Sequence, residues 1–345
     1  MDLEDKINIV KGILKDKKVA IGFSGGADST LMAHLSSEVA GETLAITINN
    51  HIFPTDFIQN TRDATELLGI KHKIVDINFY EDEYFISNDS ARCHTCRKLM
   101  YDYIQKIAIE NGFNFICDGN NISDLVIDRP GILVTYEKGF ETPFIEARLT
   151  SKEIHEYLNT HGITYSRSTT CLATRIPANT PISKEKIRRI SYCEDYILNS
   201  SDCEIVKVRD FGKTCICEVD NIENILKDCR FKYINRELLK QGYEKVALNL
   251  TPIDDDEYIK LDYKNESFSY KLPYTLNMEN TIKQLKNEII YESENKIELE
   301  NITIYENGLI EGHGLKSYEN ALDTFMEVLS KIRRNIQVKK CQQDI

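Results

Sequence analysis

A short glycine-rich segment between a β-rich run and a helical run constrains this chain most. Phe23-Ser24-Gly25-Gly26-Ala27-Asp28-Ser29 follows the β-rich residues 18–23, and a helical pattern begins at about Ser29. Glycines let a backbone approach a phosphate closely, and the N-terminus of a helix presents unpaired N–H donors with a favourable dipole. Ser24 and Ser29 add hydroxyl groups. The segment therefore predicts a strand-to-helix loop that binds phosphate.

Strand-like and helix-like runs alternate from residue 17 to about residue 119. The β-rich runs lie at 18–23, 42–48, 72–77 and 113–118, and helical runs lie near 54–68 and 93–111. This alternation predicts an α/β fold with a parallel sheet, whose ligand sits at the carboxyl ends of the strands. Asp118-Gly119-Asn120-Asn121 ends a later strand and is expected to face the same crevice.

The rest of the 345-residue chain predicts further units. After Pro181 the pattern indicates a helix from Ser183, strands at 203–209 and 213–219 joined at Phe211-Gly212, a helix from about Ile222 and a strand near 245–250. The run Asp254-Asp255-Asp256-Glu257 marks a boundary, and a helix is predicted at 317–333. We expect a nucleotide-binding domain at 1–180, a small α+β substrate or oligomerisation domain at 181–253, and a C-terminal appendage at 254–345.

Charge and composition exclude some classes of protein. The 43 basic and 55 acidic residues give a formal charge of −12, which argues against a protein built mainly to coat nucleic acid but leaves room for a local basic pocket. No apolar run is long enough to span a bilayer, and the first residues lack a signal-peptide pattern. We therefore expect a soluble, cytoplasmic protein. In that compartment the ten cysteines do not suggest a disulfide framework, so clustered ones are weighed as metal ligands or reactive thiols.

The glycine-rich loop does not match the common nucleotide fingerprints. No Lys follows its glycines, and the spacing is not GxGxxG. The string SGGxDS resembles instead the PP-loop of ATP pyrophosphatases, a resemblance that implies cleavage of ATP to AMP and pyrophosphate. The alternative is a plain strand-to-helix turn capped by Ser24 or Asp28.

Asp124, Asp128 and Arg129 follow within about three helical turns of Asp118, and such carboxylates beside a triphosphate suggest Mg²⁺ ligation. The alternative interpretation of these three residues is that they cap helices or carry surface charge.

Three cysteines form the second chemical pattern. Cys93 and Cys96 stand as CxxC at a helix start, and Cys171 follows in a segment of small polar residues. Arg92, Arg97 and Lys98 are expected to lower the pKa of the two CxxC thiols. A disulfide redox pair, a zinc site completed by His94 or another cysteine, and a three-thiolate 4Fe-4S cluster with one open iron all remain possible on spacing alone. Cys215 and Cys217 share one face of a strand with Val219 and are interpreted as core.

Together these motifs resemble the LarE family of PP-loop sulfur transferases, over residues 1–252. The matching strings are SGGADS at 24–29, RCHTCRK at 92–98, DGNNISDLVIDRPG at 118–131, TPFIEARLTSKEI at 142–154 and CLATRIP at 171–177. The resemblance implies ATP-dependent adenylation of the carboxylates of pyridinium-3,5-biscarboxylic acid mononucleotide, followed by sulfur transfer. It implies ATP contacts from Ser24, Gly25, Gly26, Asp28, Ser29, Asp118 and Gly119.

The family divides on the sulfur source. Some members sacrifice the sulfur of one cysteine at the position matching Cys171, whereas others also carry the CxxC and hold a 4Fe-4S cluster. Because Cys93, Cys96 and Cys171 are all present, the resemblance implies the cluster type, with hydrosulfide on the open iron and repeated turnover. It also implies a separate sulfide source and a homo-oligomer.

Substrate contacts carry over from the family to fewer positions. Lys207 and Arg209 point off one face of a strand, where the family binds the substrate phosphate; the alternative is a solvated strand face. Arg175 can neutralise a carboxylate or phosphate bidentately. Glu146, Asp128 and Arg129 complete the candidate set. Ala91 and Lys207 depart from the Asp and Arg usual in the family, and the resemblance does not cover the residues beyond Ile253.

Two other functions fit parts of this pattern. A tRNA thiolation enzyme also combines a PP-loop with cluster cysteines, but the acidic charge and the absence of an added CxxC zinc module argue against it. A non-catalytic nucleotide and iron–sulfur sensor would bind ATP and release no pyrophosphate.

Overall fold

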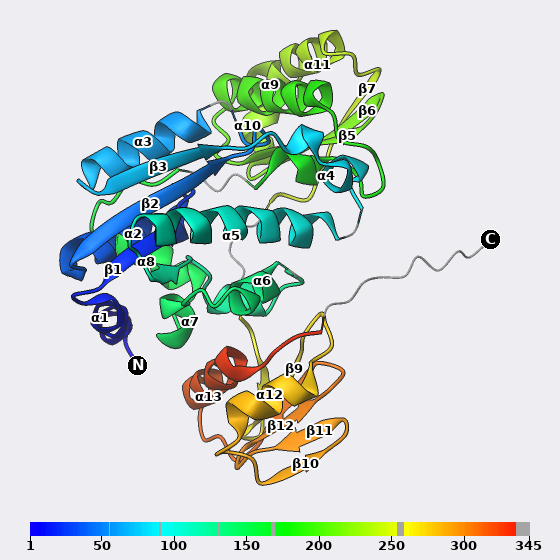
Figure 1. The fold of residues 1–345 in the computed structure, drawn as a ribbon. Helices are drawn as coiled ribbons and strands as arrows, with labels where there is room; N and C mark the ends of the chain where they lie inside the picture. The colour runs from blue at the N-terminus through cyan, green and yellow to red at the C-terminus, as the bar shows by residue number, and fades with distance from the viewer. Residues whose placement is uncertain (55, 90, 130, 167–169, 254–258, 336–345) are drawn as a thin grey trace.

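The structure, a computed structural model, describes residues 1–54, 56–89, 91–129, 131–166, 170–253 and 259–335. Within these residues the strands form three separate sheets. Figure 1 shows the parallel sheet of the N-terminal half between a small α+β unit and a C-terminal antiparallel unit. The predicted boundary at Asp254 to Glu257 lies outside the described residues.

The first sheet has the predicted α/β topology. Its four strands are parallel in the order β3-β2-β1-β4. They are β1 (Lys18–Gly22), β2 (Glu42–Asn49), β3 (Lys71–Asp76) and β4 (Phe115–Cys117). The continuous apolar runs of β1 and β2 reflect a sheet that is buried on both faces, as parallel sheets usually are.

Helices cover both faces of this sheet. On one face Val19 and Ile21 pack against helices α1, α2 and α8; on the other, Ala20 and Ile46 pack against α5. The helices and 3₁₀ turns of this half are α1 (Leu3–Leu14), α2 (Ala27–Val39), α3 (Phe57–Leu67), η1 (Phe79–Glu81), α4 (Glu83–Ser87), α5 (Arg92–Glu110), η2 (Ile122–Leu125), α6 (Ile132–Glu137), α7 (Pro143–Glu146), α8 (Ser151–Thr160) and η3 (Leu172–Arg175).

The prediction that Asp124, Asp128 and Arg129 follow Asp118 within helical turns is wrong. Only the short 3₁₀ turn η2 forms, because Asn121 and Asp124 cap it reciprocally and it ends at Leu125. Residues 126–129 are not helical, so Asp128 and Arg129 do not share a helix with Asp124, although Arg129 still pairs with it.

The α+β unit agrees with the sequence pattern. Strands β5 and β6 pair antiparallel and β7 pairs parallel to β6. Its elements are α9 (Lys184–Ser200), β5 (Val206–Phe211), β6 (Thr214–Val219), α10 (Ile222–Leu226), η4 (Lys227–Cys229), α11 (Arg230–Lys240) and β7 (Lys245–Leu248). Cys215, Cys217 and Val219 are buried together, which confirms their assignment to the core.

The C-terminal unit is an antiparallel sheet of six strands with two helices. The strand order is β10-β11-β12-β13-β9-β8. The elements are β8 (Asp262–Lys264), β9 (Ser267–Lys271), α12 (Met278–Leu285), β10 (Tyr291–Ser293), β11 (Lys296–Glu298), β12 (Ile302–Tyr305), β13 (Leu309–Gly312) and α13 (Tyr318–Lys331). Helix α13 begins with Ser317 as N-cap, so the predicted helix is confirmed.

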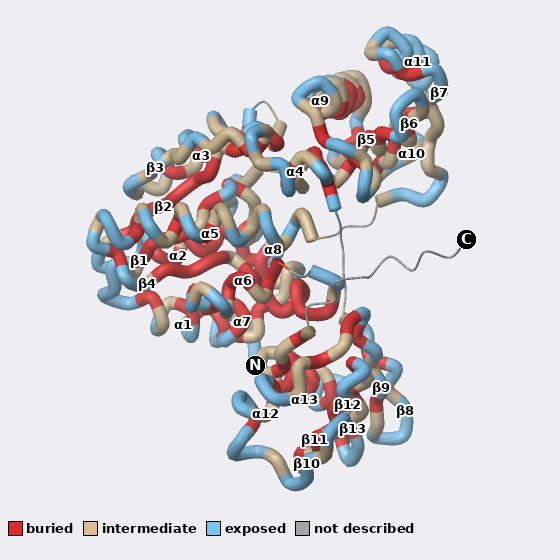
Figure 2. The backbone as a smooth tube through the Cα atoms, turned by 45° about the vertical axis from the view of Figure 1, so that its right-hand side comes forward, coloured by how far each residue is buried: buried red, intermediate tan, exposed pale blue. Residues whose placement is uncertain are grey.

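One hydrophobic core joins the C-terminal unit to the N-terminal half. Ile122, Leu125 and Ile132 belong to the same buried cluster as Leu272 and Phe325. Figure 2 shows this buried stretch continuing from the helices around α6 into the C-terminal unit. Polar contacts reinforce the junction: the Tyr274 hydroxyl donates to the Leu125 carbonyl, Arg334 pairs with Asp128 at 2.6 Å, and Arg148 pairs with Glu327 at 3.0 Å.

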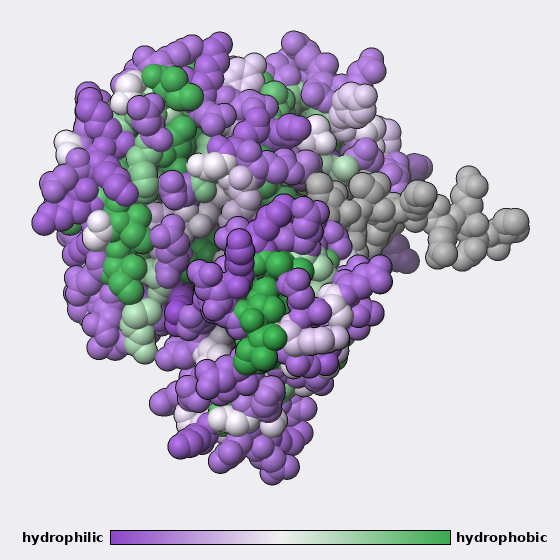
Figure 3. All heavy atoms as spheres, turned by 60° about the horizontal axis from the view of Figure 1, so that its bottom comes forward, coloured by the Kyte–Doolittle hydropathy of each residue, from purple (hydrophilic) through white to green (hydrophobic). Residues whose placement is uncertain are grey.

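The outer surface is mainly polar. Figure 3, which brings the C-terminal unit forward, shows a mostly hydrophilic surface with a few separate apolar patches. None of the helices in the described part of the chain has the length and apolar character needed to cross a membrane.

Candidate active site

The glycine-rich loop lies at the carboxyl end of β1. Gly25 has a left-handed backbone with φ 74°, and Gly26 is the N-cap of α2 without a side-chain cap bond. The Ser24 hydroxyl accepts from Gly26 N at 3.4 Å and lies 3.2 Å from the Ser29 hydroxyl. The N-terminus of α2 and these two hydroxyls therefore gather donors around one point, which suits a phosphate chain.

An apolar cavity of about 230 Å³ adjoins the loop. Its walls come from the ends of β1 and β2, from α5, and from the segment that leads into α3. Phe53 and Phe57 stack with centroids 4.3 Å apart on one side, and Met100 lies in the wall from α5. An apolar slot beside a phosphate-binding helix end suits an adenine ring. The sequence did not identify these residues, because apolar character was their only signal.

Asp118 is the centre of a buried hydrogen-bond network. Its Oδ2 accepts from Arg97 at 3.2 Å, from the Tyr101 hydroxyl at 2.6 Å and from the Thr135 hydroxyl at 2.8 Å. Asn120 donates to both carboxylate oxygens. Four of these bonds reach Oδ2 and one reaches Oδ1, so the carboxylate holds the turn after β4 in place while Oδ1 keeps one lone pair.

Gly119 lets that turn approach the glycine-rich loop. A Cβ at this position would lie 2.8 Å from the Asp28 Cβ and 3.0 Å from its carbonyl carbon, closer than real Cβ contacts allow. The predicted pair Asp118-Gly119 therefore packs directly against the start of α2. Its contact with ATP stays a prediction.

Asp28 and Asp124 bring two carboxylates together at the same place. Burial first, and then the charge of Asp124, raise the pKa of Asp28 to about 7. Asn121 donates to Asp28 at 3.2 Å, and Arg129 pairs with Asp124. A divalent cation bound with the phosphates would relieve this repulsion, which fits one or two carboxylate ligands for Mg²⁺.

The chain brings the three predicted cysteines together. Cys93 and Cys96 lie in the first turns of α5, and Cys171 is the residue before η3. Arg92 joins the two segments, because its guanidinium donates to the Ala173 carbonyl at 2.9 Å and to Cys93 Sγ at 3.3 Å. The backbone N–H of Leu172 donates to the Ile52 carbonyl at 2.9 Å and ties the same turn to the loop after β2.

The predicted lowering of the thiol pKa in the CxxC pair is wrong for Cys96. Burial, and after it the neighbouring cysteines, raises the pKa of Cys96; burial raises the pKa of Cys171 to about 11, although Arg92 opposes the shift. Arg97 does not act on the thiols, since it faces Asp118. The position of a helix start did not reveal how deeply these sulfur atoms are buried.

The three thiols have the chemistry that an iron–sulfur cluster requires. Their side chains are not placed as a set of ligands for a metal ion. Three mutually interacting thiols favour a cationic metal centre. Among the described residues no group of three or more His, Cys, Asp or Glu side chains is placed to hold a metal ion. His94, the candidate fourth zinc ligand, faces Glu137 at 3.9 Å.

The predicted anion-binding arginines have partners within the protein. Arg175 is 2% exposed and forms a two-pronged pair with Glu194, with Nε–Oε1 at 2.6 Å and Nη2–Oε2 at 3.3 Å. Arg209 donates to Glu218 at 2.9 Å and to the Thr174 carbonyl at 2.9 Å. Lys207 shares its face of β5, as predicted. These contacts fix η3 against the α+β unit.

Two further candidates lie apart from the cysteines. Glu146 ends α7, and burial and Glu141 raise its pKa while Lys17 lowers it; its described neighbours do not connect it to the glycine-rich loop. Asp128 faces Arg334 of the C-terminal unit. The structure therefore brings the loop, the carboxylates and the cysteines together, but not these two residues.

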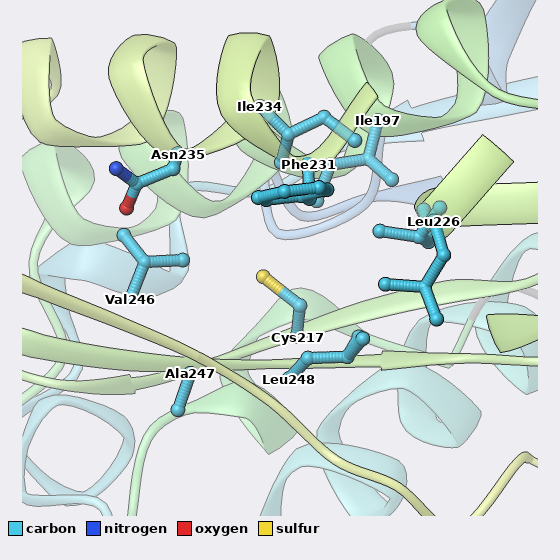
Figure 4. Close-up of a pocket in the computed structure, with 10 residues that line it drawn as sticks. Ile197, Cys217, Leu226, Phe231, Ile234, Asn235, Val246, Ala247 and Leu248 are labelled. Atoms are coloured by element: carbon cyan, nitrogen blue, oxygen red, sulfur yellow. The ribbon is translucent and has the colours of Figure 1, made fainter. Parts of the chain in front are cut away.

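A cavity in the α+β unit has different chemistry. It measures about 260 Å³ and is lined by apolar side chains except for Asn235 and Cys217. Figure 4 shows the Cys217 sulfur pointing into the space toward Phe231 and Ile234. This lining has no cation for a phosphate, so we do not assign it to the nucleotide.

Comparisons with known proteins agree with this geometry. The family model described as NAD synthase matches residues 3–100. An uncharacterized protein of Methanocaldococcus jannaschii is 29% identical over 248 residues, which cover 70% of this chain and 93% of that protein. The pyridinium-3,5-bisthiocarboxylic acid mononucleotide synthase of Lactiplantibacillus plantarum is 24% identical over 252 residues, 71% of this chain and 90% of that enzyme.

A third relative matches a shorter stretch. A tRNA-specific 2-thiouridylase of Fusobacterium nucleatum is 42% identical over 109 residues, which cover 27% of this chain and 32% of that enzyme. The likeness to the thiouridylase is therefore local, whereas the other two extend over most of the chain.

Proposed function

We propose that this chain is a PP-loop ATP pyrophosphatase and a sulfurtransferase of the LarE type, which activates carboxylates with ATP and replaces one oxygen with sulfur. The acceptor we propose is pyridinium-3,5-biscarboxylic acid mononucleotide, the biscarboxylate that corresponds to the product named for the Lactiplantibacillus plantarum relative.

One observation carries this proposal: the cysteines adjoin the nucleotide pocket. Cys96 and Met100 are one turn apart on α5, and Met100 lines the apolar pocket. Cys96, Met100, Cys171 and Phe53 pack against the same hydrophobic cluster. An adenylated acceptor held by the loop would therefore lie beside the sulfur ligands.

The proposed reaction has two steps. A carboxylate oxygen of the acceptor attacks the α-phosphorus of ATP, and pyrophosphate leaves. Sulfide then attacks the acyl carbon, the C–O bond to AMP breaks, and AMP leaves. Ser24, Gly25, Gly26 and Ser29 would bind the phosphates, and Asp28 and Asp124 would hold Mg²⁺.

Cys93, Cys96 and Cys171 would hold the 4Fe-4S cluster, and when bound it supplies the sulfide that this step needs. The chain itself orients those ligands: Arg92 holds the Cys171 turn against α5, and the Arg175–Glu194 pair fixes the end of η3. The small unit at 181–253 contributes Lys207 and Arg209 beside Thr174. A homo-oligomer and a cytoplasmic location remain predictions.

The test is anaerobic reconstitution with iron and sulfide, followed by reaction with ATP, Mg²⁺ and the acceptor. We expect pyrophosphate release that depends on the acceptor, an oxygen-to-sulfur mass change in the acceptor, and about four irons per chain that are lost in Cys93→Ala, Cys96→Ala and Cys171→Ala. ATP binding without pyrophosphate release would favour a sensor instead. Sulfur gained by tRNA and not by the mononucleotide would favour the thiouridylase function.

A further inference from the structure

His72 of β3 joins three elements near the glycine-rich loop. Its Nε2 lies 2.8 Å from the Thr47 hydroxyl of β2, and its Nδ1 lies 3.0 Å from the Thr65 hydroxyl of α3. Thr47 and Thr65 are 0% and 2% exposed, so solvent is excluded from both hydroxyl groups. Figure 1 shows α3 beside β2 and β3. One imidazole ring therefore links two neighbouring strands to the helix that packs against them.

The Thr47 hydroxyl fixes the direction of these hydrogen bonds. It donates its one proton to the Phe23 carbonyl at 2.9 Å, so it accepts from the Nε2–H of His72. Burial, and after it the charge of Arg62, lowers the pKa of His72, which leaves the ring neutral at pH 7. The Nδ1 of such a ring is an acceptor, and the Thr65 hydroxyl, which also reaches carbonyls in the preceding turn of α3, is the donor that faces it. The bonds therefore run in one direction, from the helix through the imidazole to the Phe23 carbonyl.

The Phe23 carbonyl belongs to the first peptide group of the glycine-rich loop. The N–H of the same peptide group, which is that of Ser24, donates to the Ser29 hydroxyl at 3.2 Å. Because a peptide group is planar, the bond from Thr47 to its oxygen also fixes the direction of its N–H. The position of the Ser29 hydroxyl, one of the expected phosphate contacts, therefore depends on the Thr47 bond.

The same residues contact the nucleotide pocket from behind. The rings of His72 and Phe23 pack edge to face, with centroids 6.1 Å apart and an interplanar angle of 81°. Helix α3 begins at Phe57, which lines the apolar slot beside the loop. A Cβ on Gly25 would lie 3.4 Å from the Thr61 side chain of the same helix. His72 is thus bonded both to the helix that supplies a wall of the slot and to the loop that would bind phosphate.

We propose that His72 is a positioning residue for ATP, which acts through Thr47 on the first peptide group of the loop and through α3 on the distance between the loop and the adenine wall. His72 does not line the slot itself. The inference rests on the proposed function only for the choice of ATP as the ligand. In the sequence His72 merely begins a β-rich run, so the pattern gives it no part in the site. A histidine that only stabilised the sheet would change the free energy of unfolding and not the nucleotide affinity in particular.

The test uses the full chain and α,β-methylene-ATP with Mg²⁺, an analogue that cannot be cleaved between its α and β phosphates, in calorimetric titrations. We expect Thr47→Val, which keeps the side-chain shape and removes the hydroxyl, to weaken binding about 10-fold, and His72→Leu to do the same. The double variant should also lose about 10-fold, because both substitutions break one chain of bonds. His72→Gln, whose amide can donate to Thr47, should recover most of the affinity.

Thr281→Val is the matched control. Thr281 is also 0% exposed, and its hydroxyl likewise donates to a carbonyl and accepts from an N–H, both of Arg333 in the C-terminal unit. We expect it to lower the melting temperature about as much as Thr47→Val does and to leave the affinity for the analogue within about two-fold of the unaltered protein. The same melts check that every variant folds.

Three results would overturn the inference. Unchanged affinity in Thr47→Val and His72→Leu would leave His72 a purely structural residue. A loss of roughly 100-fold in the double variant would mean that the two residues act separately. An equal loss in Thr281→Val would mean a general effect of destabilisation. No binding of the analogue by the unaltered protein would overturn this inference and the proposed function together. Failure of the proposed function alone is distinguishable, since pyrophosphate release and sulfur transfer would be absent while this pattern of affinities persisted.

Discussion

The parallel-sheet half and the C-terminal unit bury very different side chains. Around the site the buried set includes Asp118, Asn120, Asn121, Asp124 and Thr135, whereas the buried polar or charged residues described in the C-terminal unit are Thr281 and Arg334. Arg334 is also the residue that reaches across to Asp128. Buried polar groups cost free energy unless they form hydrogen bonds. Their high number in the parallel-sheet half therefore indicates the part that performs chemistry, and their low number in the C-terminal unit indicates the part that supports it.

The largest effect is expected from the cysteines, whose loss would test whether chemistry is confined to the first half. Cys171→Ser should reduce sulfur transfer by about 10³-fold or more, because it removes one of the three thiols that we propose for the sulfur chemistry, while ATP binding changes little. Thiocarboxylate formation, followed by mass spectrometry, measures it. Cys229→Ser, at an exposed cysteine of the α+β unit, should retain activity. Equal loss in both variants would mean a general requirement for thiols.

A second prediction concerns the close approach of Gly119 to the glycine-rich loop. Gly119→Ala places a methyl group 2.8 Å from the Asp28 Cβ, so the turn or the loop must move, and ATP binding should weaken by roughly 10- to 100-fold. Gly12→Ala is the control, since a Cβ there meets nothing within 4 Å and α1 should gain about 0.5–1 kcal/mol. ATP titration measures the first effect and urea unfolding the second. Unchanged ATP affinity in Gly119→Ala would separate this turn from the nucleotide.

A third prediction tests whether the C-terminal unit supports the site across the shared core. Tyr274→Phe removes the bond to the Leu125 carbonyl and should cost about 1–2 kcal/mol of unfolding free energy. Amide exchange of residues 122–129 should rise, and ATP binding should weaken a few-fold. Tyr263→Phe is the matched control, because the Tyr263 hydroxyl donates at 2.7 Å to the Leu315 carbonyl inside the C-terminal unit. If Tyr263→Phe weakened ATP binding as much as Tyr274→Phe, the junction would have no special role.

The smallest effect follows from the raised pKa of Asp28. A carboxyl whose folded pKa lies above its unfolded value near 3.8 contributes stability below pH 4 that is lost as pH rises through about 7. Without ligands, the unfolding free energy of the unaltered protein relative to Asp28→Asn should therefore fall by about 1–2 kcal/mol between pH 5 and pH 8. Urea unfolding at the two pH values measures this difference. Asp63→Asn, at an exposed position of α3, should show no such trend, and a pH-independent difference for Asp28→Asn would contradict the prediction.

Sequence patterns over a few neighbouring residues predicted those parts of the fold that form through short-range interactions. The strands of the parallel sheet, the glycine-rich loop and α5 could be predicted because periodicity and phosphate-loop chemistry act within a few residues. The Arg175–Glu194 and Arg209–Glu218 pairs could not, since each joins side chains from different elements. The thiol pKa values depended on burial, which only packing determines. The apolar slot beside the glycine-rich loop was missed for the same reason.

The bond between Tyr274 and Leu125 joins residues 149 positions apart. Ribosomes add about 5 to 20 residues per second, so Leu125 is made roughly 7 to 30 s before its partner. During that time the apolar side of residues 122–132 has no C-terminal unit to cover it, although the glycine-rich loop and α5 are already complete. The turn that carries Asn121 and Asp124 gains its support only near the end of synthesis, so a nascent chain acquires its three clustered cysteines well before the turn beside the glycine-rich loop is fully supported.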